Sequence, residues 1–257
     1  MTSPWNPTQY ERFRNERSQP FFDLVEMVQP VPGGLAVDLG CGTGELTKIL
    51  HEKVRARETV GIDSSETMLA GSAAHAGDGL RFERGDVTNF APRAPLDLLF
   101  SNAALQWVNG HETLFPALLA TLAEGGQVAI QMPANNDHAS HRVAFAVAAE
   151  EPFASAMGGY QRDWPVGAPE WYAELLDRAG FGEQSVRLQV YGHHLESRDG
   201  VVEWVKGTLL TDFEKRLSSE LYERFLERYR ERLMLELDDS RPFFYAFKRV
   251  LIWGRKG

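Results

Sequence analysis

The sequence predicts an α/β protein built on a mostly parallel, seven-stranded sheet with helices on both faces. Three observations support this fold class. In the first half of the chain, short apolar segments of strand length alternate with segments of helical periodicity. The apolar segments are hydrophobic throughout, which is typical of parallel strands buried on both faces. The composition, with 43% hydrophobic and 25% charged residues, is that of a globular protein.

The first half of the chain contains five of the seven expected strands. Each ends at glycine, proline or a polar residue, as strands next to loops commonly do. A serine, either Ser64 or Ser65, is a suitable N-cap for the second helix, and we expect the third helix to stop at Gly125 and Gly126. The expected strands are 35–39, 59–62, 80–84, 96–101 and 127–132, and the helices are 45–54, 65–74 and 112–122.

The second half has a different pattern. Residues 134–168 are mixed and contain several loop signals, and a helix is expected at 169–179. Two further strands are expected at 186–194 and 243–253, with a charged helical segment between them. Leu217, Leu221, Phe225 and Tyr229 recur at i+4 spacing and should face the body of the protein. We interpret 1–257 as one domain with an N-terminal cap (1–30) and a helical lid (about 197–240); the alternative is a partner-binding helix pair.

Composition and charge exclude several classes of protein. Cys41 is the only cysteine, which rules out an intramolecular disulfide and a cysteine zinc site. The 27 basic and 36 acidic residues give a net charge of −9, which argues against a nucleic-acid partner. No apolar run approaches the roughly 20 residues of a membrane span. The N-terminal segment carries Glu11 and Glu16 and does not resemble a signal peptide. We therefore expect a soluble cytoplasmic protein.

A glycine-rich loop is the strongest motif. Gly40, Gly42 and Gly44 follow the first strand and precede a helix, and glycines at such a turn let a ligand approach the backbone closely. Their G-x-G-x-G spacing differs from the G-x-G-x-x-G of dinucleotide sites. Glu45 would repel a pyrophosphate. The loop therefore favours a cofactor with little or no phosphate.

This loop, together with the preceding Val37-Asp38-Leu39, resembles that of the Rossmann-like methyltransferases that use S-adenosylmethionine. Polar residues follow the later strands in the same order. The resemblance implies that Asp63 receives the ribose hydroxyls, Asp86 the adenine amino group, and that Met68 packs on the adenine. The structural alternatives are that Asp63 caps a helix and Asp86 starts a loop. The implied cofactor-binding residues are Asp38, Gly40, Cys41, Gly42, Gly44, Asp63, Ser64, Met68, Asp86, Val87 and Asn102.

Cys41 lies inside the loop, and no base is near it in sequence. We interpret it as a small loop residue and not as a nucleophile.

Three further stretches resemble the trans-aconitate 2-methyltransferase family. They are residues 5–20, Asn102 to Trp107, and Gln131-Met132-Pro133 with Asn135; the similarity extends to the closing Arg249. The family implies transfer of a methyl group to one carboxylate of a small tricarboxylic acid. A carboxylic acid with a pKa near ~4 is already ionised at neutral pH, so we expect no catalytic base. Alignment and exclusion of water would suffice.

The remaining carboxylates of such a substrate need partners. Arg17 is the first candidate because arginine can bind a carboxylate through two hydrogen bonds; it could instead hold the cofactor carboxylate or be a solvated surface residue. Weaker candidates are His193, His194, Arg198 and Lys206. The two adjacent histidines should point to opposite faces of a strand, so no metal site is expected. The candidate substrate-binding residues are Arg17, Tyr10, Gln106, Trp107, Tyr160 and Tyr191.

Two other functions remain open on the sequence. Leu105-Gln106-Trp107 also occurs in methyltransferases that esterify a malonyl group on acyl carrier protein, although a net charge of −9 disfavours docking of an acidic carrier. The other alternative is a regulator that binds the cofactor without catalysis.

Overall fold

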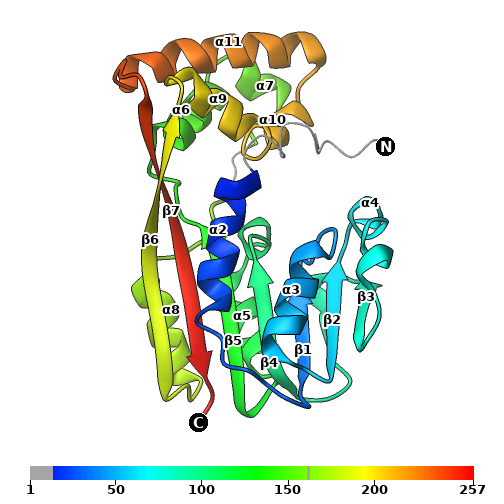
Figure 1. Ribbon diagram of the computed structural model, residues 1–257. Helices are drawn as coiled ribbons and strands as arrows, with labels where there is room; N and C mark the ends of the chain where they lie inside the picture. The colour runs from blue at the N-terminus through cyan, green and yellow to red at the C-terminus, as the bar shows by residue number, and fades with distance from the viewer. Residues whose placement is uncertain (1–13, 161–162) are drawn as a thin grey trace. The chain divides into compact units, whose positions relative to one another are not determined.

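The computed structural model describes residues 14–160 and 163–257 (Figure 1). Contacts within the chain define two compact units. Unit 1 is built from described residues between 135 and 164 and between 190 and 248. Unit 2 is built from residues 17–134, 165–189 and 249–257.

One seven-stranded sheet organises the fold, in the order β3-β2-β1-β4-β5-β7-β6. The first five strands pair in parallel, and β7 runs antiparallel to β5, with Ile130 opposite Ile252. The mostly parallel sheet expected from the sequence is confirmed. The strands are β1 (Leu35–Leu39), β2 (Glu58–Asp63), β3 (Leu80–Arg84), β4 (Leu96–Asn102), β5 (Leu122–Pro133), β6 (Glu183–Leu195) and β7 (Phe243–Arg255).

Helices cover both faces of the sheet in unit 2 (Figure 1). On one face, Phe21 meets Phe100 of β4 edge to face at 5.6 Å, and Leu50 joins the same buried cluster. On the other face, Phe115 packs against Tyr172 at 4.9 Å. These contacts bury the apolar stripes that define each helix. The helices are α2 (Arg14–Val25) and α3 (Glu45–Val54) on the first face, and α5 (His111–Leu119) and α8 (Pro169–Arg178) on the second.

Two boundaries differ from the prediction. The helix expected over 65–74 is split into α4 (Glu66–Leu69) and the 3-10 helix η1 (Ser72–His75). The double glycine does not end α5; it lies inside β5, where Gly125 has φ +73° and the β4–β5 register shifts. A Cβ at Gly126 would lie 2.8 Å from the Leu96 carbonyl oxygen, so the glycines permit an irregular strand.

Unit 1 contains five helices among the described residues. Its α6 lies in the mixed stretch 134–168, for which the sequence predicted no particular element. Much of α6 is alanine and valine, which are buried against the neighbouring helices. Its N-cap is His138 and not one of the usual capping residues. The His138 ring accepts a hydrogen bond from the Ser140 amide. The helices are α6 (Ala139–Ala148), α7 (Phe153–Ala156), α9 (Asp199–Lys206), α10 (Thr211–Glu214) and α11 (Ser219–Glu236).

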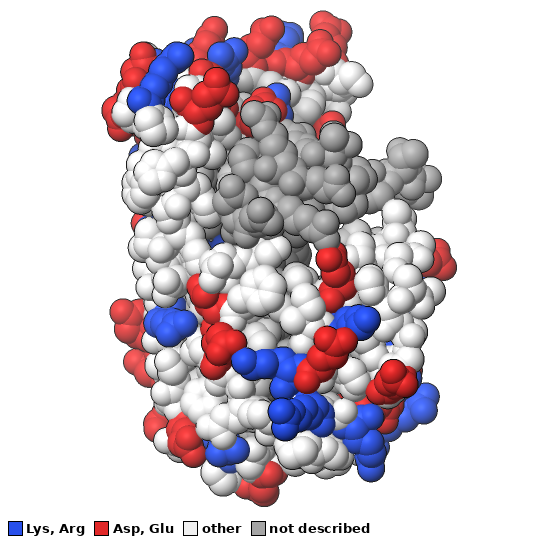
Figure 2. Space-filling model, in the orientation of Figure 1, with Lys and Arg blue, Asp and Glu red and all other residues white. Residues whose placement is uncertain are grey.

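Helix α11 is amphipathic, as its spacing predicts. Ser218 caps it by accepting a hydrogen bond from the Leu221 amide. Phe225, Tyr229 and Leu233 are buried on one face. Acidic and basic side chains are mixed over its outer face (Figure 2). No helix in residues 14–160 or 163–257 is long and apolar enough to cross a membrane.

Replacing Phe225 with alanine should lower the free energy of unfolding by about 3–5 kcal/mol, because it removes a fully buried aromatic ring. Leu235 on the same helix is 87% exposed and provides the matched control. Leu235→Ala should change stability by no more than about 0.5 kcal/mol. Urea unfolding of both variants measures the difference, and equal losses would contradict this packing.

Candidate functional site

The strand order reverses at β1, which has β2 on one side and β4 on the other. Open α/β sheets bind ligands at such a point, outside the carboxyl ends of their strands. The loop that follows β1 is Gly40 to Gly44 and lies at this position (Figure 1). The topology therefore identifies the glycine loop as the centre of the candidate site.

The loop requires glycine at all three positions. Gly40, Gly42 and Gly44 have φ angles of +80°, +57° and +81°, which other residues rarely adopt. A Cβ on Gly40 would lie 2.2 Å from the Ala104 Cβ, and one on Gly44 would lie 2.6 Å from the Phe82 ring. The bare backbone therefore packs against the turn after β4 and the Phe82 ring of β3, and side chains would fill this cradle.

Asp63 anchors the loop. One carboxylate oxygen accepts a hydrogen bond from the Gly42 amide and the other accepts one from the Ser65 amide, both at 2.9 Å. Ser65, not the exposed Ser64, caps α4 by accepting a hydrogen bond from the Met68 amide. The Met68 methyl would lie 3.1 Å from a Cβ on Gly42. The structure therefore brings these predicted residues together around the loop.

Asp86 follows β3 and begins the 3-10 helix η2 (Val87–Asn89). One of its oxygens accepts hydrogen bonds from the amide and the hydroxyl of Thr88, and these bonds lower the pKa of the carboxyl. The side chain is exposed and Val87 is half-buried. Asp86 thus has the loop-starting role considered from the sequence, and its carboxylate remains open to solvent.

Asp38, near the end of β1, is 4% exposed and accepts a hydrogen bond from the Thr47 hydroxyl at 2.6 Å. Burial, offset by this bond and reinforced by the charge of Asp63, raises the pKa of Asp38 to about 7. The sequence analysis did not identify Thr47. Thr47 lies in the first turn of the helix that follows the strand with the buried Asp38, and that position of a hydroxyl is the signal by which the sequence could have identified it.

The Cys41 thiol is buried. Burial and the charges of Asp38 and Asp63 raise its pKa well above the usual range. The thiol is therefore protonated at neutral pH, which agrees with its interpretation as a small loop residue.

A buried polar network lies at the end of β4. Gln131 is oriented so that its amide nitrogen donates to Asn102 Oδ1 at 2.8 Å, and its amide oxygen accepts from Arg249 Nη1 at 2.9 Å. Ala103 has φ +54°, an uncommon conformation for a residue with a side chain, and its amide donates to the Gln131 carbonyl. The family resemblance includes Asn102, Gln131 and Arg249, but no local pattern predicts that they interact, because they lie on β4, β5 and β7.

Two predicted substrate residues follow this turn in the 3-10 helix η3 (Leu105–Trp107). Gln106 is buried and donates to the Ala103 carbonyl, while its Oε1 accepts no hydrogen bond from the described residues. Trp107 is 52% exposed. The buried His111 supports η3, since its ring contacts the Leu105 carbonyl and the Tyr172 hydroxyl. The buried Gln106 Oε1 and the exposed Trp107 ring are therefore candidate contacts for a ligand.

The other substrate candidates are distributed differently. Tyr10 lies outside the described residues, and Arg17 is placed only as part of the α2 backbone. Tyr160 and Tyr191 belong to unit 1. Tyr160 donates a 2.6 Å hydrogen bond to Asp212, and the Arg216 guanidinium lies 3.7 Å from its ring centre.

The weaker candidates make structural contacts within unit 1. Arg198 donates to the carbonyls of Met234 and Leu237 at the end of α11. Lys206 forms an ion pair with Glu203, and the centres of the tilted His193 and Trp204 rings lie 4.5 Å apart. Among residues 14–160 and 163–257, no three His, Cys, Asp or Glu side chains form a group that could hold a metal ion.

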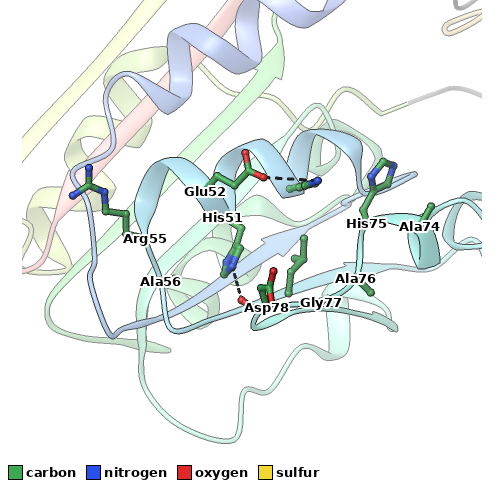
Figure 3. Close-up of a pocket in the computed structure, with 11 residues that line it drawn as sticks. His51, Glu52, Arg55, Ala56, Ala74, His75, Ala76, Gly77 and Asp78 are labelled. Carbon is green, nitrogen blue, oxygen red and sulfur yellow. Dashed lines mark hydrogen bonds and ion pairs between the residues drawn. The ribbon is translucent and has the colours of Figure 1, made fainter.

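A separate hollow of about 320 Å³ is lined by α3, η1 and the turn before β3 (Figure 3). Both ring nitrogens of His51 are engaged there, with Thr59 and the Asp78 carbonyl. The hollow lies beside the first residues of β2 and β3, at the edge of the sheet opposite the glycine loop. It is not part of the candidate site.

The chain is similar to known methyltransferases. A family model described as a methyltransferase domain matches residues 36–126. A trans-aconitate 2-methyltransferase of Deinococcus radiodurans is 42% identical over 96% of both chains. The YcgJ protein of Bacillus subtilis has a similar fold, with a TM-score of 0.61, 13% identity, and coverage of 92% of this chain and 97% of that one.

A phosphoethanolamine N-methyltransferase of Haemonchus contortus, solved with S-adenosyl-L-methionine, also has a similar fold, with a TM-score of 0.54 and 16% identity. The match covers all of this chain and 60% of the Haemonchus chain. The strand order, the glycine cradle and the matched domain together define a Rossmann-like methyltransferase. Within that class, the chain belongs to the trans-aconitate 2-methyltransferase family.

Replacing Gly40 with alanine should abolish cofactor binding, because the new methyl group would collide with Ala104 and displace the loop. Gly33→Ala is the matched control: Gly33 has φ +78° but no atom within 4 Å of an added Cβ. Gly33→Ala therefore places a side chain in the same unfavourable backbone conformation without a steric collision. Calorimetric titration with S-adenosylhomocysteine compares the two. Equal affinities in both variants would contradict the cradle.

The pH dependence of stability should reveal Asp38. Its folded-state pKa of about 7 lies above the ordinary value near 4, so the folded protein binds more protons between these values and loses stability as pH rises through them. Asp38→Asn removes this loss. Relative to the wild type, the variant should gain about 3 kcal/mol between pH 4.5 and pH 8. Urea unfolding without cofactor measures this, and a pH-independent difference would contradict it.

Proposed function

We propose that the protein transfers a methyl group from S-adenosylmethionine to one carboxylate of a small tricarboxylic acid, most specifically trans-aconitate. The products are a monomethyl ester and S-adenosylhomocysteine. The observation that carries this proposal is the identity of 42% with a trans-aconitate 2-methyltransferase along 96% of both chains. The glycine cradle at the topological switch point supports it independently.

The cradle fits the proposed cofactor. When bound, S-adenosylmethionine supplies an electrophilic methyl group on a positively charged sulfonium. The Asp63 carboxylate contacts the loop and favours a cation there, and a bound cation would in turn favour the ionised form of the buried Asp38. Each Asp63 oxygen already accepts one backbone hydrogen bond and can accept another from a ribose hydroxyl. The proposed contacts are Asp38, Gly40, Cys41, Gly42, Gly44, Asp63, Ser64, Met68, Asp86, Val87 and Asn102.

The reaction needs no catalytic base. The acceptor carboxyl, with a pKa near ~4, is an anion at neutral pH and can attack the methyl carbon directly. The protein's contribution is to align the oxygen with the methyl group and to remove water from the carboxylate. We propose that the N-terminal segment 1–30 serves as a cap and the helices within 197–240 as a lid for this purpose.

The substrate-binding roles of Arg17, Tyr10, Gln106, Trp107, Tyr160 and Tyr191 are proposals of the same kind. Gln106 is supported by its buried Oε1, which can accept a hydrogen bond from a ligand, and Trp107 by its exposed indole. Tyr160 would have to exchange its hydrogen bond to Asp212 for one to the substrate. A cytoplasmic location and the absence of nucleic-acid and membrane partners remain predictions from the sequence.

Purified protein should be incubated with S-adenosylmethionine and one acceptor at a time. The acceptors are trans-aconitate, cis-aconitate, citrate, isocitrate and malonyl-acyl carrier protein. We expect trans-aconitate to gain the mass of one methylene group and the product to release methanol in base, as an ester does. Mass spectrometry measures both, with Gly40→Ala as the negative control. Methylation of the malonyl carrier alone would identify a carrier-protein methyltransferase. Cofactor binding without methylation of any acceptor would support the alternative of a regulator that binds the cofactor without catalysis.

A further inference from the structure

The proposed substrate carries two carboxylates besides the one that is methylated. Because the protein has a net charge of −9, the positive side chains that bind these carboxylates must lie at the substrate site itself. Arg249 is a buried cation in unit 2, with 6% of its surface exposed. It pairs with Pro133, the last residue of β5, and therefore lies at the carboxyl edge of the sheet. This is the edge that carries the glycine loop.

Gln131 connects Arg249 to that loop. It is completely buried on β5 and accepts a hydrogen bond from Arg249 Nη1 while donating one to Asn102 Oδ1. Asn102 ends β4, and two residues later Ala104 faces Gly40, where an added Cβ would approach it to 2.2 Å. A continuous set of contacts therefore runs from the guanidinium to the cradle within one unit.

The chemistry of the connecting group determines what this arrangement can do. Gln131 is neutral, so its hydrogen bond orients the guanidinium without cancelling its charge. An oriented guanidinium offers a planar fork of N–H donors that matches a carboxylate. The same amide fixes Asn102 with its oxygen toward Gln131. The network thus holds a positive charge in a defined orientation beside the turn that precedes Gln106 and Trp107.

We propose that Arg249 binds one of the unmethylated carboxylates of the acid substrate and that Gln131 positions it. Arg249 is then a specificity-determining residue, and it selects acids that carry a carboxylate at the matching distance from the one that is methylated. This inference rests on the proposed function for the identity of the acid, and on the Arg249–Gln131–Asn102 contacts for the site.

The test compares Arg249→Gln, Arg249→Lys and the control Arg255→Gln. Arg255 lies on the same strand, but at its other end, where it pairs with Glu183. Calorimetry on protein saturated with S-adenosylhomocysteine measures binding of trans-aconitate. Loss of one partner from a buried charge pair should weaken binding by about 30-fold or more in Arg249→Gln and less in Arg249→Lys. The control should bind as the wild type does.

Three dicarboxylic acids identify the contact. Glutaconate, mesaconate and itaconate each lack a different carboxylate of trans-aconitate. For the acid without the carboxylate that Arg249 binds, the wild type and Arg249→Gln should have the same affinity. A merely structural arginine would instead weaken all of the acids by the same factor, and that result would overturn the proposal. Affinity for S-adenosylhomocysteine reports folding, and Arg249→Lys repeats the comparison if Arg249→Gln does not fold.

The outcomes separate this inference from the proposed function. Arginine-dependent binding of trans-aconitate without turnover would support the Arg249 site and overturn the reaction. Turnover and binding unaffected by Arg249→Gln would overturn the Arg249 site and leave the reaction standing. A wild-type protein that neither binds nor methylates any of these acids would overturn both.

Discussion

The hydrogen bond from the Gly42 amide to Asp63 is the interaction on which the geometry of the site depends. It ties the loop after β1 to the end of β2, and it is possible only because the loop has no side chains on the facing positions. Gly40 then meets Ala104 beyond β4, and Gly44 meets Phe82 of β3. One short loop therefore contacts the end of β2, the turn after β4 and a side chain of β3. The parallel sheet brings these elements together, and glycine allows the backbone to fill the space between them.

The charges around this loop suit the two partners of the proposed reaction. Asp63 at the end of β2 contacts the loop, Asp38 lies near the end of β1, and Asp86 follows β3, so this side of the sheet carries carboxyl groups that favour a cationic methyl donor. Arg249 on β7 supplies positive charge on the other side of β4, which favours an anionic acceptor. A sulfonium and a carboxylate neutralise each other as the methyl group moves. A site that separates acidic from basic residues can thus orient both reactants without a proton-transferring side chain.

Local sequence patterns failed where tertiary contacts outweigh them. Gly125 and Gly126 predict the end of a helix, but they allow an irregularity in β5 because the Leu96 carbonyl leaves no room for a Cβ. The alanine-rich segment of α6 has a weak helical signal and a histidine N-cap, and it is helical because its small residues are buried against other helices of unit 1. In both cases, neighbours distant in sequence decide the local structure.

The sequence by itself determined the parallel sheet, the glycine loop and the order of polar residues at the strand ends, because these depend on spacing within short segments. It also predicted the buried face of α11 around Phe225 and Tyr229. Only the tertiary structure decided that Asp63 braces the loop, that Asp38 is buried against Thr47, and that Arg249 reaches Asn102 through Gln131. Those contacts join residues from different strands, and strand pairing and burial, not local propensity, bring them within hydrogen-bonding distance.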